Sequence, residues 1–302
     1  MKRALKISAS AVVVLFAIVY IGASYFISSS LTEIDRKPLE DNPSNHGLQY
    51  ENVEFYPPDV DVTLRGWLML GNSLSKPLIF VHGHNSNREE YGDFLNIAAK
   101  LVGRGYSVLL FDLRGHGNSD GDRVSYGYFE QNDLRGAVDF LEGRGIAPNG
   151  VGVLGFSMGA GTAILGAAGE PRIRALVADS TYAKASDLFV SEIEGQTPVP
   201  SWIAPILVPG GQFLAKLLFD IDVGGLAPEK AVGRLPYPIL VIHGELDSRV
   251  PVGHGIRVHS AAHPDSDIWI PSGIEHTDAY PTLPKEYIQK VTEYLDRMLI
   301  AE

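Results

Sequence analysis

The stretch that most constrains this chain runs from Val151 to Gly169 and reads VGVLGFSMGAGTAILGAAG. A short apolar run of β type, Val151 to Leu154, ends at a Gly-Phe-Ser-Met-Gly turn and is followed at once by small residues of helical character. In such a strand-turn-helix unit the glycines avoid side-chain clashes, and the serine between them is held clear of the sheet. The free N–H groups at the start of the helix favour a developing oxyanion. Ser157 is therefore the candidate nucleophile.

The same layout, followed by a strand that ends in Asp179, is also typical of a dinucleotide-binding unit. That unit requires G-x-G-x-x-G, whose second glycine lets the backbone approach a pyrophosphate. Counted from Gly155, the second glycine position holds Ser157. Counted from Gly159, the last position holds Ile164. Both registers fail, so a nucleophile turn is the better interpretation.

Composition narrows the class of protein further. The chain has 302 residues, 45% of them apolar, which suits one large α/β domain with appendages. A net charge of −11 argues against a nucleic acid partner, because phosphate binding needs clustered lysine and arginine. The absence of cysteine excludes disulfides, thiol nucleophiles and cysteine-based metal sites. We expect no cofactor.

The N-terminus has the pattern of a membrane segment. Lys2, Arg3 and Lys6 precede an uncharged stretch that extends to Thr32. About 20 apolar residues span a hydrocarbon core of roughly 30 Å, and residues 7–26 meet that length. The basic cluster predicts a cytoplasmic N-terminus with the rest of the chain outside. We interpret residues 1–6 as a cytoplasmic segment and residues 7–29 as a transmembrane signal-anchor.

A cleaved signal peptide is the alternative, because Gly22-Ala23-Ser24 has the small residues of a cleavage site, and the protein would then be secreted. The apolar span continues through Phe26, which favours retention. Residues 30–47 are polar and rich in turn formers, and we interpret them as a linker that lifts the domain off the membrane.

From residue 48 to residue 302 the pattern is that of one globular domain. Apolar runs of β type alternate with helical segments, and this alternation predicts a mostly parallel sheet covered on both faces. Functional residues should then gather at the carboxyl ends of the strands. The expected strands are 49–56, 62–70 (an antiparallel opening pair), 77–81, 107–111, 151–154, 175–178, 239–242 and 267–270, and the expected helices are 91–101, 129–141 and 284–300.

Residues 181–235 do not follow the alternation. This interval contains a helical stretch at 185–194, a proline-rich break at 198–209 and an apolar segment at 212–219. We interpret it as a cap inserted between two sheet strands. Trp202, Ile206, Leu207 and Phe213 are then candidates to line a substrate pocket. The alternatives are that they form the cap's own core or touch the membrane.

A serine needs a base, and the base works best when a buried carboxylate orients it. The segment HGELDSRVP follows the strand at 239–242 and places Asp247 on a turn. The segment PSGIEH follows the last strand and places His276 on the next loop. The chain order is Ser157, Asp247, His276.

Together these pieces resemble the α/β-hydrolase superfamily, from about residue 49 to the C-terminus. The matching motifs are the His82-Gly83 loop, the turn at 112–121, the Gly155 to Gly159 elbow, the H-G-x-x-D-x-x-V-P segment ending at Pro251 and the late histidine. The chain is most similar to ABHD-type hydrolases that are described as serine aminopeptidase-like or lysophospholipase-like. The resemblance implies an α/β-hydrolase fold with an eight-stranded, mostly parallel sheet and a cap after strand six.

By this resemblance His276 is the general base and acid, and Asp247 orients it. The oxyanion hole would use the backbone N–H groups of Met158 and His84, with Asn85 as an alternative to His84. The implied activity is hydrolysis of an ester, thioester or amide through an acyl-enzyme. The substrate would be a small molecule or lipid-like, with an apolar acyl or aromatic group.

Other residues compete for these roles. Asp179 is an alternative acid, and Glu245 is interpreted as solvent-facing or as a loop support. His82 and His84 have the spacing of a metal pair, but no H-E-x-x-H accompanies them, so no metal is expected. The glycine-flanked histidines are better interpreted as hydrogen-bonded struts: His82, His116 and His243. Glu275 and Asp278 flank His276.

The alternative functions are a non-catalytic binding protein of this fold and a metal-dependent hydrolase.

Overall fold

The computed structural model describes residues 2–299 apart from 59, 73–75, 91–92, 191–192, 194–196, 198 and 201. Its contacts divide the chain into two compact units. One consists of Met1–Glu33 and Ser186–Gly225, and the other of Ile34–Ala185 and Leu226–Glu302. The domain boundaries expected from the sequence stay predictions.

The larger unit is built on one eight-stranded sheet, with the strand order β1-β2-β4-β3-β5-β6-β7-β8. β2 is antiparallel to both of its neighbours, and all other pairs are parallel. The predicted mostly parallel sheet with an antiparallel opening pair is confirmed. The strands are β1 (Glu51–Phe55), β2 (Leu64–Met69), β3 (Pro77–Val81), β4 (Ser107–Phe111), β5 (Val151–Phe156), β6 (Ile173–Asp179), β7 (Leu240–Ile242) and β8 (Asp267–Trp269).

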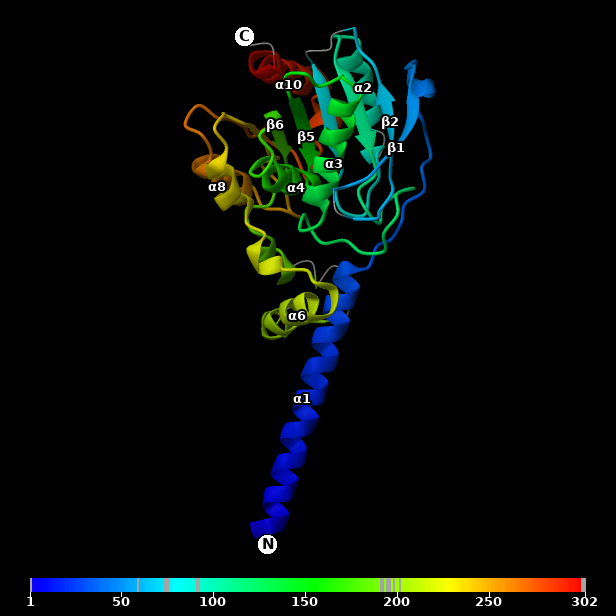
Figure 1. Cartoon of the computed structure of the whole chain (residues 1–302). Coiled ribbons are helices and arrows are strands. Elements are labelled where there is room, and N and C mark those ends of the chain that lie inside the picture. Colours follow the sequence, from blue (N-terminus) through cyan, green and yellow to red (C-terminus); the bar gives the residue numbers. More distant parts are fainter. Residues whose placement is uncertain are drawn as a thin grey trace. The chain divides into compact units, whose positions relative to one another are not determined.

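Helices cover both faces of this sheet (Figure 1). Along β4, Leu109 and Phe111 join one apolar cluster while Val108 and Leu110 join the other. A strand buried on both faces has no polar side, which explains its uninterrupted apolar sequence. On the first face lie α3 (Glu130–Gly143), α4 (Met158–Ala167), α7 (Pro228–Ala231) and α8 (Gly253–Ala261), and on the second α2 (Asp93–Val102), α9 (Ala279–Thr282) and α10 (Pro284–Leu299).

The predicted elements agree with these closely. The strands at 77–81 and 107–111 are confirmed to the residue, and the other strands and helices differ at their ends by a few residues. Two boundaries of predicted helices lie outside the described residues: the start of the helix at 91–101 and the end of the helix at 284–300. Short 3-10 turns complete the two units: η1 (Pro43–His46), η3 (Ala185–Asp187), η4 (Val223–Gly225) and η5 (Val232–Arg234).

The segment that leads into the domain is bound to the larger unit. The Arg36 guanidinium donates to the backbone carbonyls of Gly117 at 3.0 Å and Ser119 at 2.7 Å. The backbone N–H of Glu40 donates to the Glu89 carboxylate at 3.0 Å. Part of the predicted linker, at Arg36 and Glu40, is therefore hydrogen-bonded to the larger unit.

The smaller unit contains α1 (Lys2–Thr32) and α6 (Ala204–Phe219). Among the described residues, one helical stretch is long and apolar enough to cross a membrane, Ser10–Thr32. The predicted proline-rich break is wrong from residue 204 onward, because Pro205 and Pro209 both lie within α6. Proline is tolerated in the first turn, where its missing N–H needs no partner. Pro209 lies in the helix interior, where proline removes one helical hydrogen bond and crowds the carbonyl four residues earlier. Part of the predicted helix at 185–194 lies outside the described residues.

Candidate active site

Ser157 occupies a strained turn between β5 and α4. Its φ of 52° and ψ of −118° lie in a region that residues with a side chain rarely adopt. A Cβ atom at Gly155 would lie 2.6 Å from the carbonyl oxygen of Gly159, and one at Gly159 would lie 2.1 Å from that of Val81. The close approach of α4 to β5 and β3 therefore requires both glycines of the G-x-S-x-G pattern.

The structure brings Ser157, His276 and Asp247 into one hydrogen-bonded row. The distance from Ser157 Oγ to His276 Nε2 is 2.9 Å, and that from His276 Nδ1 to Asp247 Oδ2 is 2.7 Å. The three residues follow β5, β8 and β7, respectively. Because these strands are parallel, their carboxyl ends meet at one edge of the sheet.

The Asp247 carboxylate is buried and accepts hydrogen bonds on both oxygens. Oδ1 accepts from the backbone N–H of Val250 at 2.7 Å and of Arg249 at 3.1 Å. Oδ2 faces His276 and also lies 3.2 Å from His243 Nε2. Burial by itself would raise the pKa of Asp247, but the hydrogen bonds from His243 and His276 outweigh it and lower the pKa to about 2. The carboxylate is therefore charged at neutral pH, as the orienting role requires.

The loops that hold Asp247 and His276 are bound to each other. The Glu275 carboxylate accepts from the Ser248 N–H at 3.2 Å and from the Ser248 hydroxyl at 3.1 Å. A Cβ atom at Gly244 would lie 2.4 Å from the carbonyl oxygen of Ile274, so the two loops touch through their backbones. Glu275 thus ties the loops together.

Asp179, the alternative acid, lies at the end of β6 and is not hydrogen-bonded to His276. Its Oδ1 accepts from the Ser180 hydroxyl at 3.0 Å, and the Ser180 oxygen accepts the N–H of Thr277 at 3.0 Å. Burial raises the pKa of Asp179 to about 7. Ser180, which connects this buried carboxyl to the residue after His276, was not among the predicted site residues. Its only sequence signal was its position directly after a strand end.

The two residues predicted for the oxyanion hole lie in the loop after β3 and at the first position of α4. Within the described part of the chain, the backbone N–H groups of His84 and Met158 have no protein acceptor. The neighbouring N–H of Gly83 donates to the buried Glu90 carboxylate at 2.6 Å. Burial raises the pKa of Glu90 to about 7. Glu90, whose carboxylate binds the loop after β3 through the Gly83 N–H, was also not predicted, because nothing in its sequence context distinguishes it.

The imidazole of His84 is buried and stacks on Tyr126, with ring centroids 5.2 Å apart. Burial lowers its pKa to about 3, so the ring is neutral. The ring of His84 is thus fixed by its packing on Tyr126, independently of the backbone N–H of the same residue.

His82 and His243, interpreted from the sequence as struts, are bonded to the backbone. His82 Nδ1 lies 2.8 Å from the Gly83 carbonyl, and Nε2 accepts the N–H of Leu113 at 3.0 Å. His243 Nε2 lies 2.7 Å from the Val250 carbonyl. Burial lowers the pKa of His82 to about 3. Both ring nitrogens of His82 are used by the protein, and the described residues contain no cluster of three His, Asp or Glu that could hold a metal ion.

Other loop charges also support the fold. Glu245 accepts from the Ser272 hydroxyl at 2.5 Å, in agreement with a loop support. Asp112, which begins the predicted turn at 112–121, forms a buried ion pair with Arg88 at 2.6 Å. His116 Nδ1 lies 2.9 Å from the Arg114 carbonyl within that turn.

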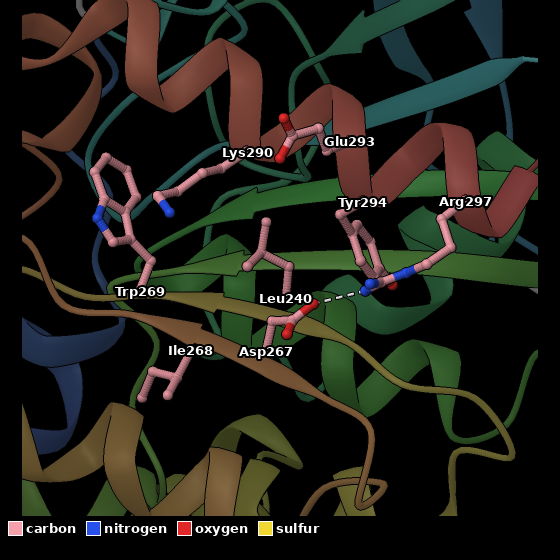
Figure 2. A pocket seen from close by; sticks show the side chains of 8 residues that line it. All are labelled: Leu240, Asp267, Ile268, Trp269, Lys290, Glu293, Tyr294 and Arg297. Atoms are coloured by element: carbon pink, nitrogen blue, oxygen red, sulfur yellow. Dashed lines mark hydrogen bonds and ion pairs between the residues drawn. The ribbon is translucent and has the colours of Figure 1, made fainter.

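A cavity of about 250 Å³ lies elsewhere, between the last two strands and α10 (Figure 2). Leu240 and Asp267 begin their strands, whereas the Ser157 row lies beyond strand ends. Arg297 and Asp267 form an ion pair at 2.6 Å, and Lys290 lies 5.3 Å from the Trp269 ring (Figure 2). No residue of the Ser157 row lines this cavity, so we do not interpret it as the substrate pocket.

Comparisons with known proteins agree with this fold. The family model for serine aminopeptidase, S33, matches residues 73–220. An uncharacterized Bacillus subtilis protein, YqkD, is 26% identical over 95% of this chain and 94% of its own. A thiohydrolase of Aspergillus aculeatus, aneE, is 36% identical over 44% of this chain and 42% of its own. An esterase of Pyrococcus furiosus has a similar solved structure, with a TM-score of 0.73 and 26% identity over 89% of this chain and 98% of its own.

The chain belongs to the α/β-hydrolase superfamily, and it is a hydrolase of that fold. The resemblance inferred from its five ordered motifs is confirmed.

Proposed function

We propose that this protein is a membrane-anchored serine hydrolase that works through an acyl-enzyme. Ser157 is the nucleophile, His276 the general base and acid, and Asp247 the residue that orients His276. The observation that supports this most is the hydrogen-bonded row of 2.9 Å and 2.7 Å that starts at a serine with a left-handed backbone. Backbone strain of this kind clusters at functional sites, so the positive φ of Ser157 supports a role in the chemistry.

The reaction follows from this geometry. His276 Nε2 takes the proton of the Ser157 hydroxyl while the oxygen attacks a carbonyl carbon, and the Asp247 carboxylate stabilises the imidazolium that forms. The N–H groups of His84 and Met158 receive the negative charge on the carbonyl oxygen. His276 then protonates the leaving group. Water, activated by the same histidine, hydrolyses the acyl-enzyme.

We infer that the bond cleaved is an ester, a thioester or an amide next to an apolar acyl or aromatic group. The names of two relatives, an esterase and a thiohydrolase, support acyl transfer to water. Hydrolysis rates over a series of p-nitrophenyl esters of increasing chain length test this inference. A preference for the acetyl ester would contradict a long acyl pocket.

We propose further that residues 7–29 anchor the protein, with the N-terminus in the cytoplasm. Ser24, in the alternative cleavage site, lies within a continuous helix that extends to Thr32, and it is buried. Intact mass of the mature protein and carbonate extraction of membranes test the anchor. A new N-terminus near Tyr25, with the protein in the soluble fraction, would show a cleaved signal peptide.

Labelling with a fluorophosphonate probe tests the central proposal. Native protein should be labelled and should gain one adduct on Ser157, whereas Ser157→Ala and His276→Ala should not be labelled. Ser260→Ala is the matched control, because it removes an exposed serine of α8. Labelling that persists in Ser157→Ala would refute the assignment. An unlabelled native protein would support the non-catalytic alternative, and activity abolished by a chelator would support the metal-dependent one.

A further inference from the structure

The helix α6 exposes an apolar stripe along one side. Ile206, Phe213 and Leu217 are spaced by seven and four residues, so they lie on the same side of the helix, and Trp202 is an exposed residue of the turn that precedes it. Their exposed fractions are 60%, 65% and 64%, with 75% for Trp202. Of the four residues singled out in the sequence, Trp202, Ile206 and Phe213 are exposed and do not form the cap's own core, whereas Leu207 is buried. A contiguous apolar surface of this kind marks an interaction site.

α6 packs against α1 within the same unit, and the contact includes Gly210, which lies beside the stripe four residues after Ile206, as well as Gly211. A Cβ atom at Gly210 would lie 2.3 Å from Ser24 Oγ, and one at Gly211 would lie 3.4 Å from Ile27 Cγ2. The Tyr20 hydroxyl donates to the backbone carbonyl of Ile206 at 3.2 Å. Close approach through small residues, with a hydrogen bond between helices, is how helices associate in membranes.

The position of this contact along α1 sets the surroundings of α6. Tyr20, Ser24 and Ile27 all lie inside the candidate span Ser10–Thr32. Ser24 precedes the end of that span by eight residues, which is about 12 Å along the helix and less than half of a hydrocarbon core of roughly 30 Å. If α1 crosses a bilayer, Ser24 lies in the leaflet nearer to Thr32, and α6, which contacts Ser24, lies in that leaflet too.

The charges of α6 suit that environment. Lys216, near its C-terminal end, is the one charged residue in its sequence, and its ammonium group pairs with the Asp222 carboxylate at 2.5 Å. The helix has 16 residues, about 24 Å, which is too short to span a bilayer but long enough to lie within one leaflet.

We propose that α6 is inserted beside α1 in the outer leaflet, with the stripe Trp202, Ile206, Phe213 and Leu217 in contact with lipid acyl chains. The partner of this surface is thus the bilayer itself. The inference rests on the proposed anchor, and it adds a second attachment, made by the segment between β6 and β7. A second protein copy on the stripe is the alternative occupant that the experiment must separate.

The cysteine-free chain makes a direct test possible. Single cysteines replace Phe213 on the stripe, Phe16 in the span as the anchor reference, and Glu286 on the exposed side of α10 as the aqueous reference. Each full-length variant is labelled with an environment-sensitive fluorophore and reconstituted into phosphatidylcholine and phosphatidylglycerol vesicles. The vesicles contain either unmodified lipid or lipid with a nitroxide quencher on the acyl chain. Leu217→Cys serves as a second stripe variant.

We expect quenching by the acyl-chain nitroxide at Phe213→Cys and Leu217→Cys, as at Phe16→Cys, and none at Glu286→Cys. Quenching at Phe16→Cys alone would leave the anchor intact and overturn the insertion of α6. Stripe positions that are shielded from a water-soluble thiol reagent but not quenched would show a protein on the stripe, which also overturns it. An unquenched Phe16→Cys would overturn the anchor, and the inference with it.

Discussion

Replacing Asp247 with asparagine tests the proposed mechanism and its energetics in one variant. The carboxylate accepts four hydrogen bonds, from the side chains of His276 and His243 and from the backbone N–H groups of Arg249 and Val250. An asparagine amide has one accepting oxygen and one donating nitrogen. Its nitrogen must face either the backbone donors or the two imidazoles. In the second case His276 is forced into the tautomer that cannot accept the serine proton.

The structure sets the size of the expected loss of kcat and of the expected loss of stability. A wrong tautomer with the geometry otherwise retained lowers kcat by about 10⁴-fold. Depression of the Asp247 pKa from 3.8 to about 2 is equivalent to about 2 kcal/mol of stability at neutral pH. Because the folded-state pKa is lowered, this contribution is complete above the unfolded-state value. It is lost as pH falls from 3.8 toward 2. The stability difference between native protein and variant should therefore shrink across that window.

Two measurements check this reasoning. Initial rates on a p-nitrophenyl ester give kcat, and urea unfolding at pH 7 and at pH 3 gives the free energy of unfolding. Asp179→Asn is the matched control, because it changes a buried carboxyl of the same edge that is not bonded to His276. If Asp247→Asn retained activity within tenfold of native while Asp179→Asn lost it, the acid would be Asp179. A stability difference that grew on acidification would refute the electrostatic argument.

Three further predictions concern the supports of the site. Gly159→Ala should cost about 3 kcal/mol of stability by urea unfolding, because its Cβ would lie 2.1 Å from the Val81 carbonyl; native-like stability would contradict this packing. Ser180→Ala should lower kcat roughly tenfold with KM unchanged, since it frees Thr277 beside the histidine, and an unchanged kcat would contradict the positioning role. Burial raises the pKa of Asp179 to about 7, so the folded state retains a proton that the unfolded state releases, and stability should fall as pH rises from 3.8 to 7. Asp179→Asn should flatten that fall in unfolding curves, and an unchanged slope would refute it.

Much of the sheet could be predicted because its signals are local. The runs at 77–81 and 107–111 are apolar apart from the leading Ser107, and the strands found there are buried on both faces. The start of α6 could not be predicted in this way. Pro205 and Pro209 signal a break on local grounds, yet the helix forms over both, with its glycines packed against α1. Tertiary packing outweighed the local preference.

By itself, the sequence determined which residue types stand at the ends of which strands. The glycine-flanked Ser157, with Asp247 and His276 later in the chain, follows from patterns a few residues long, because turns and apolar runs are local properties. Only the tertiary structure decided which carboxylate meets the histidine. Asp179 and Asp247 both follow buried strands, and the hydrogen bond goes to Asp247 while Asp179 binds Ser180. The direction of a side chain at a strand end depends on loops contributed by distant segments, and no local pattern records it.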